Sequence, residues 1–193
     1  KWCDLLIHYK WNAGSAGSLD LTGVWPHGGD EIVALATHNN SLFIFGTKQI
    51  LIYTGANDPA TMELSDSIGN TGCVGRDTVQ NTGADIFFLS DSGLRSVMRT
   101  IQEKSAPLRN ISRNVNNDVL DYLNNEVGGA TVKSAYSPID SFYLLTFVVS
   151  GVTYCFDTRT MLEDGAARAT VWPNVKHRAY HYSKDRILYV GQV

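Results

Sequence analysis

The histidines are the residues in this sequence whose types and spacing come nearest to a metal site. Five occur in the chain, and His177 and His181 lie four positions apart. Their surroundings, "HRAYHYS", have the composition of a strand. Residues four apart on a strand share a face but lie roughly 13 Å from each other. Because that distance is too long for both to bind one ion, we expect no metal site here.

Cysteines and carboxylates give no stronger indication of chemistry. Cys3, Cys73 and Cys155 are odd in number and widely spaced, whereas zinc sites and disulfide frameworks use closely spaced pairs. Asp157 is near Glu163 and Asp164 in the sequence, but such pairs of carboxylates are expected by chance in an acidic β-protein. No G-x-S-x-G, Walker, H-E-x-x-H or C-x-x-C motif occurs. We therefore expect no enzyme activity, no catalytic, metal-binding or cofactor-binding residue, and no cofactor.

The elements that would position functional residues are mostly short strands. The stretch "EIVALATHNNSLFIFGTKQILIYTG", residues 31–55, contains three apolar runs separated by polar residues. His38-Asn39-Asn40 predicts a tight hairpin between the first two, because asparagine tolerates positive φ. A second hairpin is predicted in "IFFLSDSGLRSVM", with Ser90–Gly93 as its turn and Leu94–Met98 as its second strand.

Three segments depart from the strand pattern. Residues 12–23 are rich in small side chains and predict a loop. Residues 56–84 are polar and glycine-rich, and predict a long loop insertion with one short strand at Arg76–Gln80. In residues 107–127, apolar side chains recur every three or four positions, Pro107 suits a first helical turn, and glycines follow. This segment predicts a single amphipathic helix.

The strand patterns favour one architecture over another. "LFIF", "ILIY" and "FYLLTFVV" are apolar at consecutive positions, which predicts strands covered on both faces. Among antiparallel folds, a propeller blade packed between two neighbours has this property. We predict an all-β fold over residues 1–193, a whole or partial β-propeller with antiparallel four-stranded blades and one inserted helix. A β-sandwich is the alternative. The predicted core contains Leu42, Ile44, Ile52, Phe87, Leu89, Leu145 and Phe147.

Charge and chain ends limit the function classes. A net charge of −3 and a pI near 5.9 give no basic footprint for wrapping nucleic acid. The apolar runs are shorter than a membrane span, so we expect no membrane insertion by this segment. The chain starts at Lys1 and stops within a strand pattern, which leads us to expect a part of a longer polypeptide.

The order of several motifs resembles a known family. The meander Glu31–Gly55 reads E-I-x-A-L, then L-x-I-F, then I-x-x-Y-x-G, and "SIGNTGCVGRDTV", "GADIFFLSDSGLRSV" and "ISRNVNNDVLDYL" follow it in turn. This order is similar to the propeller-bearing region of tail tubular protein B (the nozzle) and of tail accessory, or stabilisation, proteins of short-tailed bacteriophages. The resemblance covers residues 31–127, and members of the family are much longer than this chain.

The resemblance implies a structural role in the phage tail. Family members form homo-oligomeric rings, usually six-fold, below the portal and adaptor. They close the DNA ejection channel before infection and let the genome pass afterwards without specific binding. The partners implied are the adaptor, tail tube and tail fibre proteins. The implied location is the virion, after assembly in the host cytoplasm.

Two other function classes stay open at this point. A carbohydrate- or receptor-binding module would expose aromatic side chains on loops, and Trp25 beside Pro26 is the best candidate for such a residue. A propeller glycan hydrolase would need carboxylates that converge around the propeller axis, and the sequence shows no such set. Residues 12–30 and 56–84 are the segments in which we expect functional surfaces.

Overall fold

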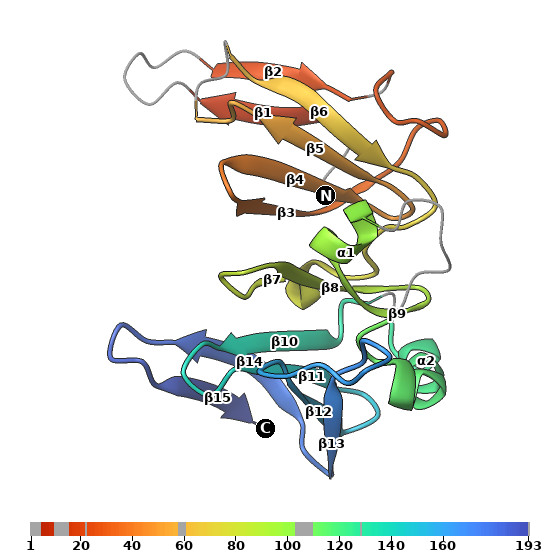
Figure 1. Cartoon of the computed structure of the whole chain (residues 1–193), viewed down its shortest axis with the longest axis vertical. Helices are drawn as coiled ribbons and strands as arrows, with labels where there is room; N and C mark the ends of the chain where they lie inside the picture. Colours follow the sequence, from red (N-terminus) through yellow and green to blue (C-terminus); the bar gives the residue numbers. More distant parts are fainter. Residues whose placement is uncertain are drawn as a thin grey trace. The chain divides into compact units, whose positions relative to one another are not determined.

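The computed structural model describes residues 5–9, 16–21, 23–57, 61–102, 110–127 and 129–192. The chain divides into two compact units, Lys1–Cys73 (unit 1) and Val74–Val193 (unit 2) (Figure 1). Both units are built from antiparallel sheets. The predicted all-β class is therefore confirmed, while a single propeller-like region over the whole chain stays a prediction.

Unit 1 contains a two-stranded sheet, β1-β2, and a four-stranded meander, β3-β4-β5-β6. Its strands are β1 (Leu5–Tyr9), β2 (Ala16–Asp20), β3 (Ile32–His38), β4 (Ser41–Gly46), β5 (Ile50–Thr54) and β6 (Glu63–Ile68). The predicted hairpin between β3 and β4 is confirmed. Asn39 and Asn40 connect these strands with φ values of 47° and 61°, the left-handed region that such a two-residue turn requires.

Two strands of unit 1 lie where the sequence predicted loops. β2 occupies part of 12–23, and β6 occupies part of 56–84. β6 escaped prediction because Glu63–Ile68 is mostly polar. It forms the edge of its sheet and pairs only with β5, so most of its side chains can remain in water.

The core of unit 1 explains the apolar runs of β4 and β5. One cluster of buried side chains joins the sheet to the segment that precedes it; its members are Leu21, Trp25, Ile32, Ile44, Leu51 and Tyr53. Phe43, Phe45, Ile50 and Ile52 are buried as well, so β4 and β5 are buried at consecutive positions. Trp25 is only 5% exposed. The expectation that it lies open on a loop is wrong, because its ring packs in this core.

The described residues of unit 2 form three sheets, with strand orders β7-β8-β9, β10-β11-β12-β13 and β14-β15. Its elements are the 3₁₀ turn η1 (Arg76–Thr78), β7 (Gln80–Asn81), β8 (Ile86–Ser90), β9 (Gly93–Ser96), α1 (Val97–Gln102), the 3₁₀ turn η2 (Arg113–Val115), α2 (Asn116–Asn124), β10 (Val132–Ser137), β11 (Phe142–Phe147), β12 (Val152–Asp157), β13 (Arg168–Pro173), β14 (His177–Tyr182) and β15 (Leu188–Gln192). The strand predicted at Arg76–Gln80 is mostly wrong, because η1 occupies its first three residues.

The helix predicted over 107–127 is much shorter in the structure. α2 covers Asn116–Asn124 and follows η2, while Pro107 lies outside the described residues. The Ile111 N–H donates to the carbonyl oxygen of Leu94 at 2.8 Å, so this part of the chain is bonded to β9. The side chain of Ile111 is apolar because it is buried beside a strand. Its place in the sequence also fits the three- and four-residue spacing of a helix, which explains the incorrect prediction.

A second helix, α1, begins where a strand was expected to continue. β9 ends at Ser96, and Val97–Gln102 is helical. The Asp85 carboxylate accepts a hydrogen bond from the Met98 N–H at 3.1 Å. It also contacts the Ser96 hydroxyl. Because a carboxylate that accepts first-turn N–H groups stabilises a helix start, Asp85 explains the change of structure at this point.

In unit 2, the β7–β9 sheet lies beside the β10–β13 sheet (Figure 1), and β14 of the third sheet contacts β10. On one face, Tyr143, Leu145 and Phe147 of β11 share a core with residues of β8, β9 and α2. On the other face, the Thr146 hydroxyl lies 2.6 Å from the hydroxyl of Tyr180 in β14. This layering explains why β11 and β12 are buried at nearly every position.

The predicted core is confirmed at six of its seven positions. Ile44, Ile52, Phe87, Leu89, Leu145 and Phe147 are each no more than 5% exposed. The seventh residue, Leu42, is half-buried and packs at the margin of the unit 1 cluster. It lies one position from the β3–β4 turn, where the sheet ends.

Candidate functional site

A cavity lies in unit 2 at the place where the first elements of its three sheets meet. β10 contacts η1, β7 and β14. The cavity has a volume of about 380 Å³ and is lined by nine residues of these elements: Arg76, Asp77, Val79, Gln80, Lys133, Ser134, Arg178, Ala179 and Tyr180. Charged and polar side chains dominate this lining, which makes the cavity the strongest candidate site in the described part of the chain.

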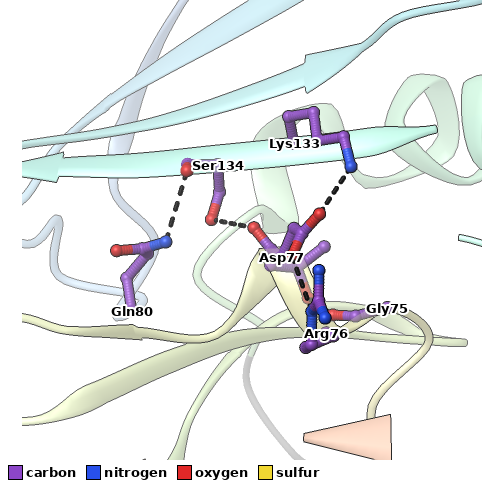
Figure 2. A network of polar contacts seen from close by, with 7 residues as sticks. Gly75, Arg76, Asp77, Gln80, Lys133 and Ser134 are labelled. Carbon is purple, nitrogen blue, oxygen red and sulfur yellow. Dashed lines mark hydrogen bonds and ion pairs between the residues drawn. The ribbon is translucent and has the colours of Figure 1, made fainter. Parts of the chain in front are cut away.

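Asp77 forms the centre of a charged network in this cavity (Figure 2). The Lys133 ammonium donates to Asp77 Oδ2 at 2.5 Å, and Arg76 Nε donates to Asp77 Oδ1 at 3.0 Å. Burial alone would raise the pKa of Asp77 by desolvation, but the hydrogen bonds and charges of Lys133 and Arg76 outweigh it and lower the pKa. Asp77 is therefore ionised at neutral pH.

Backbone contacts hold this network in place. The Ser134 hydroxyl donates to the Asp77 carbonyl oxygen at 2.8 Å, and Gln80 Nε2 donates to the Ser134 carbonyl oxygen at 3.2 Å (Figure 2). The buried Tyr143 hydroxyl donates to the Thr78 carbonyl oxygen at 2.6 Å. These bonds connect η1 and β7 to β10 and β11, so the positions of Asp77 and Lys133 are fixed by the sheets.

The charges in the lining do not balance. Arg76, Lys133 and Arg178 carry three positive charges and Asp77 carries one negative charge, so 3 − 1 gives a local charge of +2. Arg178 is exposed on β14, and within the described residues no ion pair involves it. A positive cavity therefore occurs in a chain whose net charge is −3.

A chain of hydrogen bonds lies behind the cavity wall. The Tyr180 hydroxyl lies 2.6 Å from Thr146 Oγ1 and 2.9 Å from His177 Nδ1. Thr146 Oγ1 in turn lies 2.7 Å from Thr153 Oγ1. Burial raises the pKa of Tyr180 to about 12 and lowers the pKa of His177. Both side chains are therefore neutral near pH 7 and join β14 to the central sheet.

We predict that His177 makes stability depend on pH. Burial lowers the pKa of His177 in the folded protein below the usual histidine value of about 6.5, so the unfolded chain takes up a proton first as the pH falls. The free energy of unfolding should decrease below about pH 6.5 until the folded pKa is reached. His177→Gln should weaken this dependence, as measured by urea unfolding at several pH values between 7.5 and 5. His181→Gln, at an exposed position of the same strand, is the control. A wild-type pH dependence in His177→Gln would contradict the prediction.

The histidines and cysteines singled out in the sequence are not among the residues that line this cavity. His177 is buried and His181 is exposed on β14, and among the described residues no three metal-ligating side chains gather. Cys155 is buried in β12, where desolvation, with smaller contributions from Asp157 and Asp140, raises its pKa to about 11. Its thiol is protonated at neutral pH. Cys3 lies outside the described residues.

Cys73 and Asp157, which were also named in the sequence analysis, lie outside the cavity lining. Cys73 is buried. Asp157 accepts hydrogen bonds from Arg159, with 2.6 Å between Asp157 Oδ2 and Arg159 Nη2.

No helix among the described residues is long and apolar enough to cross a membrane.

The cavity residues were missed in the sequence because their relation is not local. Asp77 and Lys133 are 56 residues apart. Arg178 lies on yet another sheet. Each residue alone has the appearance of ordinary surface charge, and no spacing rule connects them.

The motifs that carry the phage-tail resemblance contact each other in unit 2. Asn116 Nδ2 donates to the Ser92 carbonyl oxygen at 3.1 Å, and Asn110 Nδ2 donates to the same oxygen. The Leu94 N–H donates to Ser112 Oγ at 2.9 Å. The "SDSG" turn and the "NISRNVN" segment thus form one hydrogen-bonded structure.

No family model matches the chain. No curated protein matches it either. Among solved structures, the chain is similar to PorZ, described as an essential bacterial surface component of the type-IX secretion system of Porphyromonas gingivalis, with a TM-score of 0.37 and 15% identity. The match covers 86% of this chain but 19% of PorZ. A likeness at this TM-score carries no argument about fold or function.

Proposed function

We propose that this chain is a structural part of a bacteriophage tail, in the nozzle ring that forms and closes the DNA ejection channel below the portal and adaptor. The observation that carries the proposal is the contact between the two matched motifs. Ser92, in the "SDSG" turn, accepts a hydrogen bond from Asn116 of the second motif and another from Asn110, the residue directly before that motif. The two motifs follow each other in the resembling family, and in this chain they form one hydrogen-bonded structure.

The layers of unit 2 favour a partial β-propeller as the architecture of this part. Three successive antiparallel sheets stack, and the first element of each, η1 with β7, then β10, then β14, borders the same cavity. In a propeller, the first strands of successive blades surround the axis and the faces of neighbouring blades pack together. A β-sandwich would have two layers, and its strands would leave one face of each sheet in water.

The charge of the chain suits a channel that lets DNA pass. A wall that neutralised many phosphates would bind DNA strongly and retard its passage. A net charge of −3 does not favour strong binding to phosphates, and the positive cavity is small enough to meet only a single anionic group. We therefore propose transient passage of the genome without specific binding.

The other function classes gain no support. The glycan-binding alternative rested on Trp25 as an exposed aromatic residue, and that side chain is buried in unit 1. A glycan hydrolase needs two carboxylic acids facing one substrate. In the described lining of the cavity, Asp77 is the one carboxylate, and it is paired with Lys133 and Arg76. The absence of enzyme activity remains a prediction.

The proposal requires an oligomer of defined symmetry. We expect the full polypeptide that contains this chain to assemble, alone or with its adaptor, into a closed homo-oligomeric ring, six-fold as in the resembling family. Electron microscopy of the purified assembly would show the ring and its symmetry. A polypeptide that stays monomeric, with and without the adaptor, would contradict the proposal.

A further inference from the structure

We propose that the cavity formed by η1, β7, β10 and β14 binds a small ligand through a single oxyanion group, a carboxylate or a phosphate. The inference goes beyond the proposed tail function and does not depend on it. Three positive side chains, Arg76, Lys133 and Arg178, line the cavity against one carboxylate, Asp77. An anion is the ligand that would balance this charge.

The cations retain hydrogen-bond donors for such a ligand. An ammonium has three donors and a guanidinium has five. Lys133 gives one donor to Asp77 Oδ2, and Arg76 gives its Nε–H to Asp77 Oδ1. Within the described residues no ion pair occupies Arg178. Donors from three different elements therefore remain for the oxygen atoms of an anion.

Asp77 prepares the site. Its carboxylate accepts hydrogen bonds from Lys133 and Arg76 on opposite oxygen atoms, which brings both cations to one side of the cavity before a ligand arrives (Figure 2). The Lys133 side chain is only 26% exposed, so part of its desolvation is complete in the unliganded protein. Preorganised donors in a partly desolvated site bind an anion more strongly than the same groups on an open surface.

The size of the cavity limits the ligand. A volume of about 380 Å³ lies at the lower end of the range for small-molecule sites. Polar atoms of Gln80 and Ser134 are already bonded to backbone oxygens, so recognition falls mainly on the cations. The site thus suits one anionic group on a small molecule. The proposal does not require the cavity to distinguish between small molecules that carry this group.

The test is a titration of the whole chain with two probes. Inorganic phosphate and acetate are added separately at low ionic strength, and the guanidinium Nε–H signal of Arg178 is followed by NMR. We expect saturable shifts with at least one probe, and the comparison of the two shows whether phosphate or carboxylate is preferred. Binding should weaken as sodium chloride is added, because salt screens an exposed charge. If neither probe gives a saturable shift, the proposal is wrong.

Two variants separate the site from the overall charge. Arg178→Gln removes an exposed cation of the lining, so the fold should be retained. Binding is then followed at the backbone amide of Lys133. The affinity should fall by about tenfold or more, which is the effect of losing one charge-assisted hydrogen bond. Lys184→Gln removes an equal charge from the same β14–β15 hairpin outside the lining and should leave the affinity within about twofold, since exposed charges at a distance are screened. Equal affinities in both variants would overturn the proposal.

Discussion

Replacement of Gly93 by alanine is expected to destabilise unit 2 by about 3 kcal/mol or more. Gly93 has φ of +124°, a conformation that residues with a side chain rarely adopt. A Cβ atom there would overlap Asn116 Oδ1 and lie 2.8 Å from both Asn110 Nδ2 and Ser112 Oγ. These groups cannot move freely, because Asn110 and Ser112 donate hydrogen bonds to Asn116 Oδ1, and Asn116 Nδ2 donates to the Ser92 carbonyl oxygen in the "SDSG" turn.

The measurement for Gly93→Ala is the free energy of unfolding in urea, compared with Gly83→Ala. Gly83 also has positive φ, +85°, but a Cβ atom at this position meets nothing within 4 Å. Gly83→Ala therefore introduces backbone strain without a Cβ collision, and it should lower the free energy of unfolding by about 1 kcal/mol. Equal losses in the two variants would contradict the predicted collision between a Cβ atom at position 93 and the side chains of the 110–116 segment.

Leu51→Ala is expected to cost unit 1 about 2–5 kcal/mol of stability. Leu51 is fully buried in β5 and packs in one cluster with Trp25 and Ile44. Its truncation removes apolar contacts and leaves a cavity that a closely packed sheet cannot close. Urea unfolding followed by the fluorescence of Trp25 and the other tryptophans would measure the loss.

Leu64→Ala is the matched control for Leu51→Ala. Leu64 lies in the neighbouring strand β6 but is 44% exposed, so the same change of side chain should cost less than about 1 kcal/mol. A loss at Leu64 as large as the loss at Leu51 would contradict the assignment of β6 as a solvated edge strand.

Local signals predicted the parts of the fold in which sequence neighbours determine the structure. The β3–β4 turn depends on Asn39 and Asn40 themselves, and their positive φ values confirm the hairpin. The apolar runs of β4, β5, β11 and β12 predicted burial on both faces, and these strands are buried at consecutive positions. A hydrophobic run between turn residues carries this information without reference to distant segments.

Structure that depends on distant partners was predicted poorly. The start of α1 is stabilised by Asp85, which lies 13 residues before Met98, and no short-range pattern reveals this cap. Ile111 appeared to belong to a helix because it is apolar, but its N–H group bonds to Leu94 of the preceding hairpin. β6 lacks an apolar pattern because an edge strand can be polar on both faces.

The candidate site could not be predicted for the same reason. Arg76 and Asp77 belong to η1, Lys133 to β10 and Arg178 to β14. Their shared cavity exists only because the first elements of three sheets converge. A sequence shows four separated charges, whereas the fold creates one cavity with a charge of +2.

The most direct measurement of the central claim is the position of this chain in a virus particle. A short epitope inserted between Lys184 and Asp185, in the exposed turn after β14, should leave the sheets intact, because exposed turn tips tolerate insertions. Virions assembled with the tagged full polypeptide would be bound by an antibody fragment and imaged by cryo-electron microscopy. The nozzle proposal predicts fragments in a symmetric ring around the tail axis, below the portal and adaptor. Labels confined to the capsid shell or to the fibres, or particles that lack the tagged polypeptide altogether, would contradict it.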